Sequence, residues 1–116
     1  MITIRPADKA FLESISAPAG TDAMVLRDGD DRITGHGLFR VEGDTIEVLS
    51  VEAEETLLVD GIIRSILNTG DCRGAKTGIC RVAELAKVLC RLEFTEENGL
   101  WSVSIENFFR GECHCS

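Results

Sequence analysis

The C-terminal end of the chain carries a dense group of metal-binding side chains, Cys113-His114-Cys115. Thiolates and imidazole are common ligands of zinc and iron, and a four-coordinate site needs three or four such side chains from the protein. The two sulfurs are separated by one residue, whereas common zinc motifs place two residues between them. Cys72 or Cys80 would complete a ligand set if the end of the chain folds back. A zinc or iron site, a redox-active thiol pair and cysteines without a specific role are the three alternatives.

A second group of ionisable residues surrounds the junction at residues 51–61, where a strand pattern changes into a helix pattern. Glu52, Glu54, Glu55 and Asp60 place four carboxylates there, and no basic residue accompanies them up to position 60. The start of a helix attracts anions through its free amides and its dipole. Four carboxylates would repel a polyanionic ligand at the same place. The junction therefore lies where a ligand would be expected to bind, but its negative charge would repel a phosphate group.

The elements that position these residues follow from the spacing of apolar side chains. Alternation predicts strands, and a spacing of three to four residues predicts helices. Expected strands cover residues 2–5, 23–27, 33–41, 45–51, 75–82, 93–97 and 100–105, and expected helices cover residues 7–16, 54 to about 68, and 83–91. Gly70 is expected to end the second helix, and Asn98-Gly99 is the strongest hairpin turn.

This order predicts an α+β fold with a mixed α/β sheet. Three consecutive strands joined by tight turns form an antiparallel meander. The strands before and after the second helix form a parallel pair, which makes that helix a central crossover connection. The last two strands form a C-terminal hairpin.

Length and composition restrict the class of protein. A chain of 116 residues with 44% hydrophobic and 28% charged residues predicts one domain over residues 1–116, with residues 106–116 as a C-terminal tail. A net charge of −8 argues against binding to nucleic acid or to an anionic membrane. No apolar run reaches the roughly 20 residues of a membrane helix, and no signal peptide is recognised at the start. We therefore expect a cytoplasmic protein whose five cysteines are free thiols or metal ligands.

The pair Phe108-Phe109 adds an apolar element to the tail. In an extended chain, adjacent side chains point to opposite sides, so one phenylalanine needs a second surface. We expect this segment to pack on the sheet as a flap. A protein contact is the alternative, including a homodimer formed through this pair or through an open sheet edge. A small molecule or a protein is the expected partner.

The order of elements resembles the core of the GNAT superfamily, the acyl-CoA-dependent N-acetyltransferases. In that family an Arg/Gln-x-x-Gly-x-Gly/Ala turn holds the cofactor pyrophosphate with its backbone amides at a helix start. The segment from Leu58 to Ile63 resembles this turn, and Gly61 matches its first glycine. Leu58 replaces the Arg or Gln, and Ile63 replaces the second Gly or Ala. The Ile63 side chain is expected to obstruct the approach of the pyrophosphate.

A second family motif, Tyr-x-x-x-Gly-Phe, resembles residues 89–94. Phe94 matches its phenylalanine, whereas Leu89 replaces the tyrosine and Glu93 the glycine. The sequence contains no tyrosine at all. The phenol that often protonates the leaving thiolate in this family therefore cannot come from this chain.

The resemblance implies an N-acyltransferase that uses acetyl-CoA or another acyl-CoA. Its cofactor site would comprise Leu49, Ser50, Val51, Gly61, Ile62 and Ile63. Glu47 would be the general base, provided that partial burial raises its pKa, whereas His36 is expected to be a surface or hydrogen-bonded histidine. The alternative is a non-catalytic GNAT-fold module that serves in binding or regulation and has a thiol or metal site formed by the C-terminal cysteines. Such a module could have no cofactor at all. The sequence does not identify the acceptor.

Overall fold

The computed structural model describes residues 2–114, and of residues 110–114 it describes the backbone alone. Seven strands, four α-helices and two short 3₁₀ helices, marked η, follow one another along these residues. In chain order the elements are β1 (Thr3–Pro6), α1 (Lys9–Ser14), β2 (Asp22–Arg27), β3 (Ile33–Glu42), β4 (Thr45–Ala53), η1 (Thr56–Leu58), α2 (Val59–Cys72), β5 (Thr77–Cys80), η2 (Ala83–Leu85), α3 (Ala86–Arg91), β6 (Thr95–Glu97), β7 (Leu100–Ser104) and α4 (Ile105–His114).

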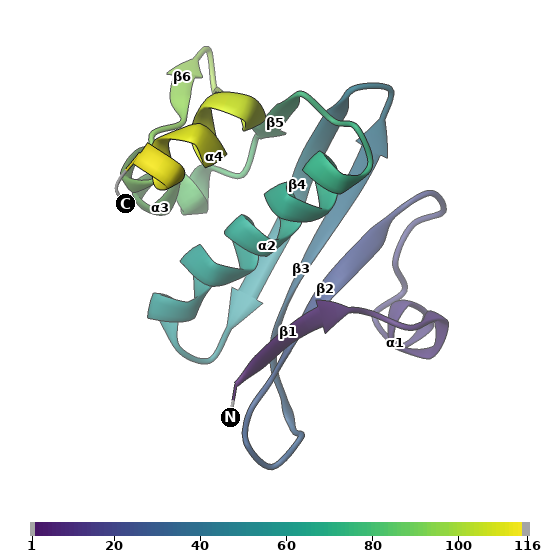
Figure 1. Ribbon diagram of the computed structural model, residues 1–116. Coiled ribbons are helices and arrows are strands. Elements are labelled where there is room, and N and C mark those ends of the chain that lie inside the picture. Colours follow the sequence, from purple (N-terminus) through teal and green to yellow (C-terminus); the bar gives the residue numbers. More distant parts are fainter. Residues whose placement is uncertain (1, 115–116) are drawn as a thin grey trace.

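All described strands belong to one sheet in the order β1-β2-β3-β4-β5-β7-β6. β1 to β4 are antiparallel neighbours, β4 and β5 are parallel, and β6 and β7 form a hairpin. α2 connects the two parallel strands and lies across one face of the sheet (Figure 1). Asn98 and Gly99 both have positive φ, 53° and 83°, as a two-residue type I′ hairpin turn requires. The predicted meander, central crossover helix, parallel pair and hairpin are confirmed.

The core lies between the sheet and α2, and α2 packs directly on glycines of the strands. Its buried residues have the predicted helical spacing: Val59, Ile62, Ile63, Ile66, Leu67 and Gly70. Glycines on the facing strands make room for them. A Cβ atom on Gly37 would lie 2.5 Å from Ile62 Cγ2, and one on Gly78 would lie 2.5 Å from Leu67 Cδ2. This close contact fixes α2, and therefore its first turn, relative to β3, β4 and β5.

The expectation that Gly70 ends this helix is wrong. α2 continues to Cys72, and Gly70 is buried where a Cβ atom would lie 2.8 Å from Ile46 Cγ2. Gly74, with φ +88°, follows the helix end instead. Gly70 thus serves close packing, and a sequence pattern does not distinguish that role from helix termination.

The C-terminal segment also differs from the expected extended tail, because residues from Ile105 onward form α4. The Ser104 hydroxyl accepts a hydrogen bond from the Asn107 backbone N–H at 3.4 Å and caps the helix. Ile105 is fully buried, and Phe108 and Phe109 pack against the core with their rings at right angles. The spacing of Ile105, Phe108 and Phe109 is that of one helix face. Both phenylalanines therefore pack within the domain, as a helix and not as an extended flap.

The face of the sheet opposite α2 is partly covered by α1, and we call it the α1 face. His36 alternates along β3 with Gly37, which faces α2, and the His36 ring meets the Phe11 ring of α1 at 5.4 Å between centroids. Arg40 and Glu47, a cross-strand pair of β3 and β4, lie on the same face. Among the described helices, none is long and apolar enough to cross a membrane.

Candidate functional site

β4 extends beyond the end of β5, which leaves part of one edge without a neighbouring strand in the described chain. The parallel pairing begins with Thr45 opposite Thr77 and stops with Val48 opposite Cys80. β4 continues to Ala53 and stays paired with β3 on its other side. Free backbone N–H and C=O groups along such an edge can bind an extended ligand. We call this edge, residues 49–53, the β4 opening.

A β-bulge marks the beginning of the β4 opening. Val48 lies opposite Phe39, but Ser50 lies opposite Leu38, so Leu49 is an extra residue without a partner on β3. A bulge bends its strand and increases the local twist, and bulges are frequent next to active sites. Here the bulge coincides with the last residue of β4 that pairs with β5. The two strands therefore diverge from this point.

The predicted cofactor residues separate into two groups. Leu49, Ser50 and Val51 lie along the β4 opening and are half-buried. Ile62 and Ile63 are fully buried in the core, so their side chains cannot touch a ligand. The expectation that Ile63 obstructs the start of α2 is therefore wrong. Gly61 is half-buried, and a Cβ atom there would lie 3.5 Å from Ile4 Cδ1, an ordinary contact.

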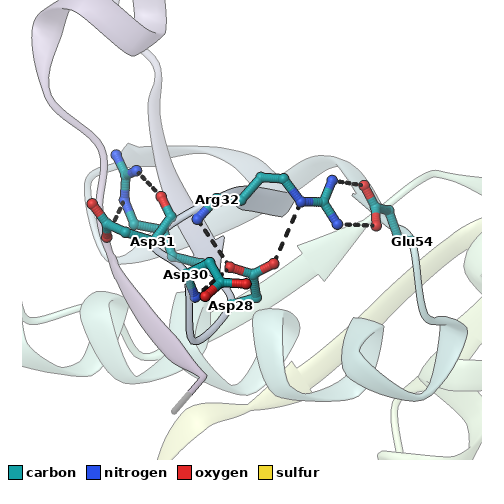
Figure 2. Close-up of polar contacts among 6 residues, drawn as sticks. Asp28, Asp30, Asp31, Arg32 and Glu54 are labelled. Carbon is teal, nitrogen blue, oxygen red and sulfur yellow. Dashed lines mark hydrogen bonds and ion pairs between the residues drawn. The ribbon is translucent and has the colours of Figure 1, made fainter.

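The start of α2 is dominated by carboxylates that bind arginines of the same chain. The Arg32 guanidinium donates to both Glu54 oxygens, at 2.9 and 3.0 Å, and lies 3.4 Å from Asp28 (Figure 2). One turn into α2, Arg64 donates to Asp60 at 2.6 Å. The sequence interpretation missed Arg32 because it precedes Glu54 by 22 residues. The antiparallel register of β3 and β4 is what brings the two together.

The hydrogen bonds around Arg32 favour the charged forms of Glu54, Asp28 and Arg32. The hydrogen bond from Arg32 lowers the pKa of Glu54, and the same pair raises the pKa of Arg32. The pKa of Asp28 is also lowered, chiefly because its carboxylate accepts from the Arg32 backbone N–H. Glu54 is thus a negative charge held by Arg32 two residues before η1.

A shallow cleft of about 370 Å³ lies where β3 and β4 run past the end of β5. Its lining residues are Ile33, Thr34, Gly35, His36, Glu52, Ala53 and Glu54. The His36 side chain is 17% exposed and its Nε2 lies 3.7 Å from a Glu52 oxygen, whereas Glu52 is 77% exposed. The cleft therefore combines an imidazole held against Phe11 with two carboxylates, beside the β4 opening.

Glu47, the predicted general base, binds two arginines. Its Oε1 accepts from Arg40 at 3.4 Å and its Oε2 accepts from Arg81 at 2.7 Å, and the side chain is only 15% exposed. Glu47 pairs with Ile79 of β5, so it lies before the strands diverge. Both carboxylate oxygens therefore already accept a hydrogen bond from an arginine. The role of Glu47 as a base remains a prediction.

The contacts of Glu47 with Arg40 and Arg81 predict a measurable effect on stability. Glu47→Gln leaves two guanidinium groups facing an amide, and we expect a loss of about 1–2 kcal/mol, between the values for exposed and buried ion pairs. Urea unfolding followed by circular dichroism measures it. Glu42→Gln is the matched control, because Glu42 also binds Arg40, at 2.9 Å, but is 75% exposed. Equal effects of the two substitutions would contradict a special contribution from Glu47.

The described cysteines do not gather into a metal site. Cys72 is exposed, whereas Cys80 is buried, and burial raises the pKa of the Cys80 thiol. Over the side chains of residues 2–109, no three His, Cys, Asp or Glu residues converge on one point. The side chains of Cys113, His114 and Cys115 lie outside the described residues, so a zinc or iron site there stays a prediction.

Comparison with known proteins identifies the fold. No protein-family model matches the sequence, and no curated protein does. Solved structures do match. The spermidine/spermine N-acetyltransferase of Vibrio cholerae aligns with a TM-score of 0.75 and 11% identity, over 95% of this chain and 98% of the other. The ribosomal-protein-S18-alanine N-acetyltransferase of Escherichia coli aligns with 0.73 and 12%, over 90% and 94%. The chain has the GNAT fold. A GNAT-family structure from Staphylococcus aureus agrees, with 0.73 and 8% identity, over 90% and 99%.

The GNAT fold implies acyl-CoA as a cofactor, and the two parts of this site fit it unequally. The β4 opening offers a neutral strand edge of Leu49, Ser50 and Val51, which suits the amide groups of a pantetheine arm. Beside the α2 N-cap residue Leu58, a cavity of about 100 Å³ is lined by three carboxylates and one guanidinium. That lining does not fit a diphosphate, because like charges at contact distance cost several kcal/mol.

Proposed function

We propose that this GNAT domain is an N-acyltransferase that moves an acyl group from a thioester to an amine. The observation that carries the proposal is the β4 opening with its bulge at Leu49. Amide groups of the thioester arm would bond the free strand edge, as an added strand does. The carbonyl would then lie next to the bulge, on a rigid element of the fold. Positioning of this kind accelerates a bimolecular reaction without any charged group.

The acceptor amine would enter through the cleft on the α1 face. The exposed Glu52 carboxylate attracts a cationic amine, and His36 beside it can take up the proton that the amine loses. His36 suits this role better than Glu47, since it pairs with Glu52, beyond the last β4–β5 pair. The amine nitrogen attacks the carbonyl, the carbon–sulfur bond breaks, and the thiolate takes a proton from water because the chain has no tyrosine.

The experiment measures binding and turnover separately. Acetyl-CoA and S-acetylpantetheine are titrated by calorimetry, and acetylated products are identified by mass spectrometry with two acceptors, spermidine and a peptide that begins with alanine. These acceptors follow the names of the matching Vibrio and Escherichia enzymes. Binding of a thioester together with an N-acetyl product supports the proposal, and His36→Gln is expected to lower turnover about 100-fold with thioester binding unchanged.

A second candidate is a non-catalytic GNAT-fold module. It is favoured by the absence of tyrosine and by the two arginines that hold Glu47. Failure of both thioesters to bind, together with no product from either acceptor, would overturn the enzyme proposal in favour of this module. Formation of an N-acetyl product would exclude the module.

A further inference from the structure

Carboxylates of the chain itself lie at the starts of η1 and α2, the two helices that follow β4. Neither Glu55, the N-cap residue of η1, nor Leu58, that of α2, caps its helix with a side-chain hydrogen bond. The first amides of a helix lack acceptors within it, so they attract anions. Asp60 lies in the first turn of α2, and Glu54, before η1, accepts from the Arg32 guanidinium through both of its oxygens (Figure 2).

The charges around the small cavity next to Leu58 oppose a further anion. Asp28, Glu54 and Glu55 line it together with Arg32. Arg32 is shared by Glu54 and Asp28, and Arg64 binds Asp60 at 2.6 Å. Arg32 and Arg64 therefore each have a carboxylate partner. A diphosphate that binds Arg32 would lie next to the Glu54 carboxylate, whose two oxygens already accept from that guanidinium.

The β4 opening has the opposite character. Leu49, Ser50 and Val51 carry no charge, and the free edge offers backbone donors and acceptors. A neutral arm with amide groups can bind there without meeting the acidic cavity. The β4 opening thus favours a neutral thioester arm, whereas the start of α2 disfavours phosphate.

We infer that the acyl donor of this domain is held through a pantetheine-type arm and not through a nucleotide diphosphate. This inference rests on the proposed function and narrows it to a donor class, acyl thioesters of pantetheine or of a similar short amide arm. Glu54, with Glu55, is the specificity-determining group, because it holds Arg32 and repels phosphate.

The test compares S-acetylpantetheine with acetyl-CoA by calorimetry in the full chain. The wild-type protein is expected to bind S-acetylpantetheine at least as tightly as acetyl-CoA. Its affinity for acetyl-CoA is expected to rise as salt increases from about 0.01 M to about 0.15 M, where the screening length falls from roughly 30 Å to 8 Å. A phosphate cradle would show the reverse, since salt weakens attraction.

Substitution of Glu54 and Glu55 tests the effect of their charges on acetyl-CoA binding. Glu54→Gln combined with Glu55→Gln is expected to increase acetyl-CoA affinity about tenfold and to leave S-acetylpantetheine affinity within about twofold, since the substitutions remove two negative charges that repel the diphosphate. The matched control combines Glu13→Gln with Glu97→Gln, two exposed residues of α1 and β6, and changes the net charge equally. It should alter neither affinity.

The outcomes distinguish this inference from the proposed function. Acetyl-CoA that binds wild-type protein tenfold tighter than S-acetylpantetheine, with affinity falling as salt rises, would overturn the inference and leave the acyltransferase proposal intact. An unchanged acetyl-CoA affinity in the Glu54 and Glu55 variant would also overturn it. If neither thioester binds, the proposed function fails, and the inference fails with it.

Discussion

Gly37→Val is expected to lower the free energy of unfolding by about 3 kcal/mol, at the upper end of the usual cost of overpacking a core. The new Cβ atom would lie 2.5 Å from Ile62 Cγ2 and 2.8 Å from Ile66 Cδ1. Both isoleucines are fully buried, so they cannot move toward solvent. The sign of the effect is informative, because valine is otherwise preferred over glycine in a strand. Guanidinium unfolding measures the change.

Gly61→Ala is the control for this substitution. Gly61 also lies next to the packing surface, in α2, but a Cβ atom there would meet only Ile4 Cδ1 within 4 Å, at 3.5 Å. Alanine within a helix is favoured over glycine by roughly 0.5–1 kcal/mol, so this variant should be slightly more stable than wild type. An unchanged unfolding midpoint for Gly37→Val would show that α2 does not pack against β3 as closely as the structure describes.

Much of the fold could be predicted from local patterns. The spacing of Ile62 and Ile66 predicted α2, and Asn98-Gly99 predicted the last hairpin, since both signals arise from residues close in sequence. α4 was missed because the adjacent pair Phe108-Phe109 was interpreted without Ser104, the residue that caps the helix. The spacing of Ile105, Phe108 and Phe109 after this capping residue was a local signal for a helix.

The site was less predictable, because its decisive contacts join distant residues. Glu54 meets Arg32 across 22 positions, and Glu47 meets Arg81 across 34. Neither contact follows from periodicity; both depend on the register of the sheet. The bulge at Leu49 is a further example, since the extra residue shifts the alternation by one position and is identified only from the register of β4 against β3. The sequence therefore predicted the position of the junction but not the arginine that binds its carboxylate.

Deletion of Leu49 is expected to separate folding from ligand binding. Leu49 is the extra residue of the bulge, so its removal places Val48, Ser50 and Val51 opposite Phe39, Leu38 and Gly37 in regular alternation. Every side chain of β4 keeps its face of the sheet, which an ordinary one-residue deletion in a strand would not achieve. The protein should therefore stay folded, with its free energy of unfolding within about 1 kcal/mol of wild type.

The same deletion should narrow the β4 opening, because the bend that separates β4 from β5 disappears with the bulge. Loss of one or two backbone hydrogen bonds to a ligand, at roughly 1 kcal/mol each, predicts S-acetylpantetheine binding weakened about tenfold or more. Leu49→Ala is the matched control, since it retains the extra residue and should bind within about threefold of wild type. A deletion variant that is folded and still binds at wild-type affinity would exclude the β4 opening as the donor site. If the deletion unfolds the domain while Leu49→Ala does not, the bulge is a requirement of the fold itself and not a feature kept for the ligand.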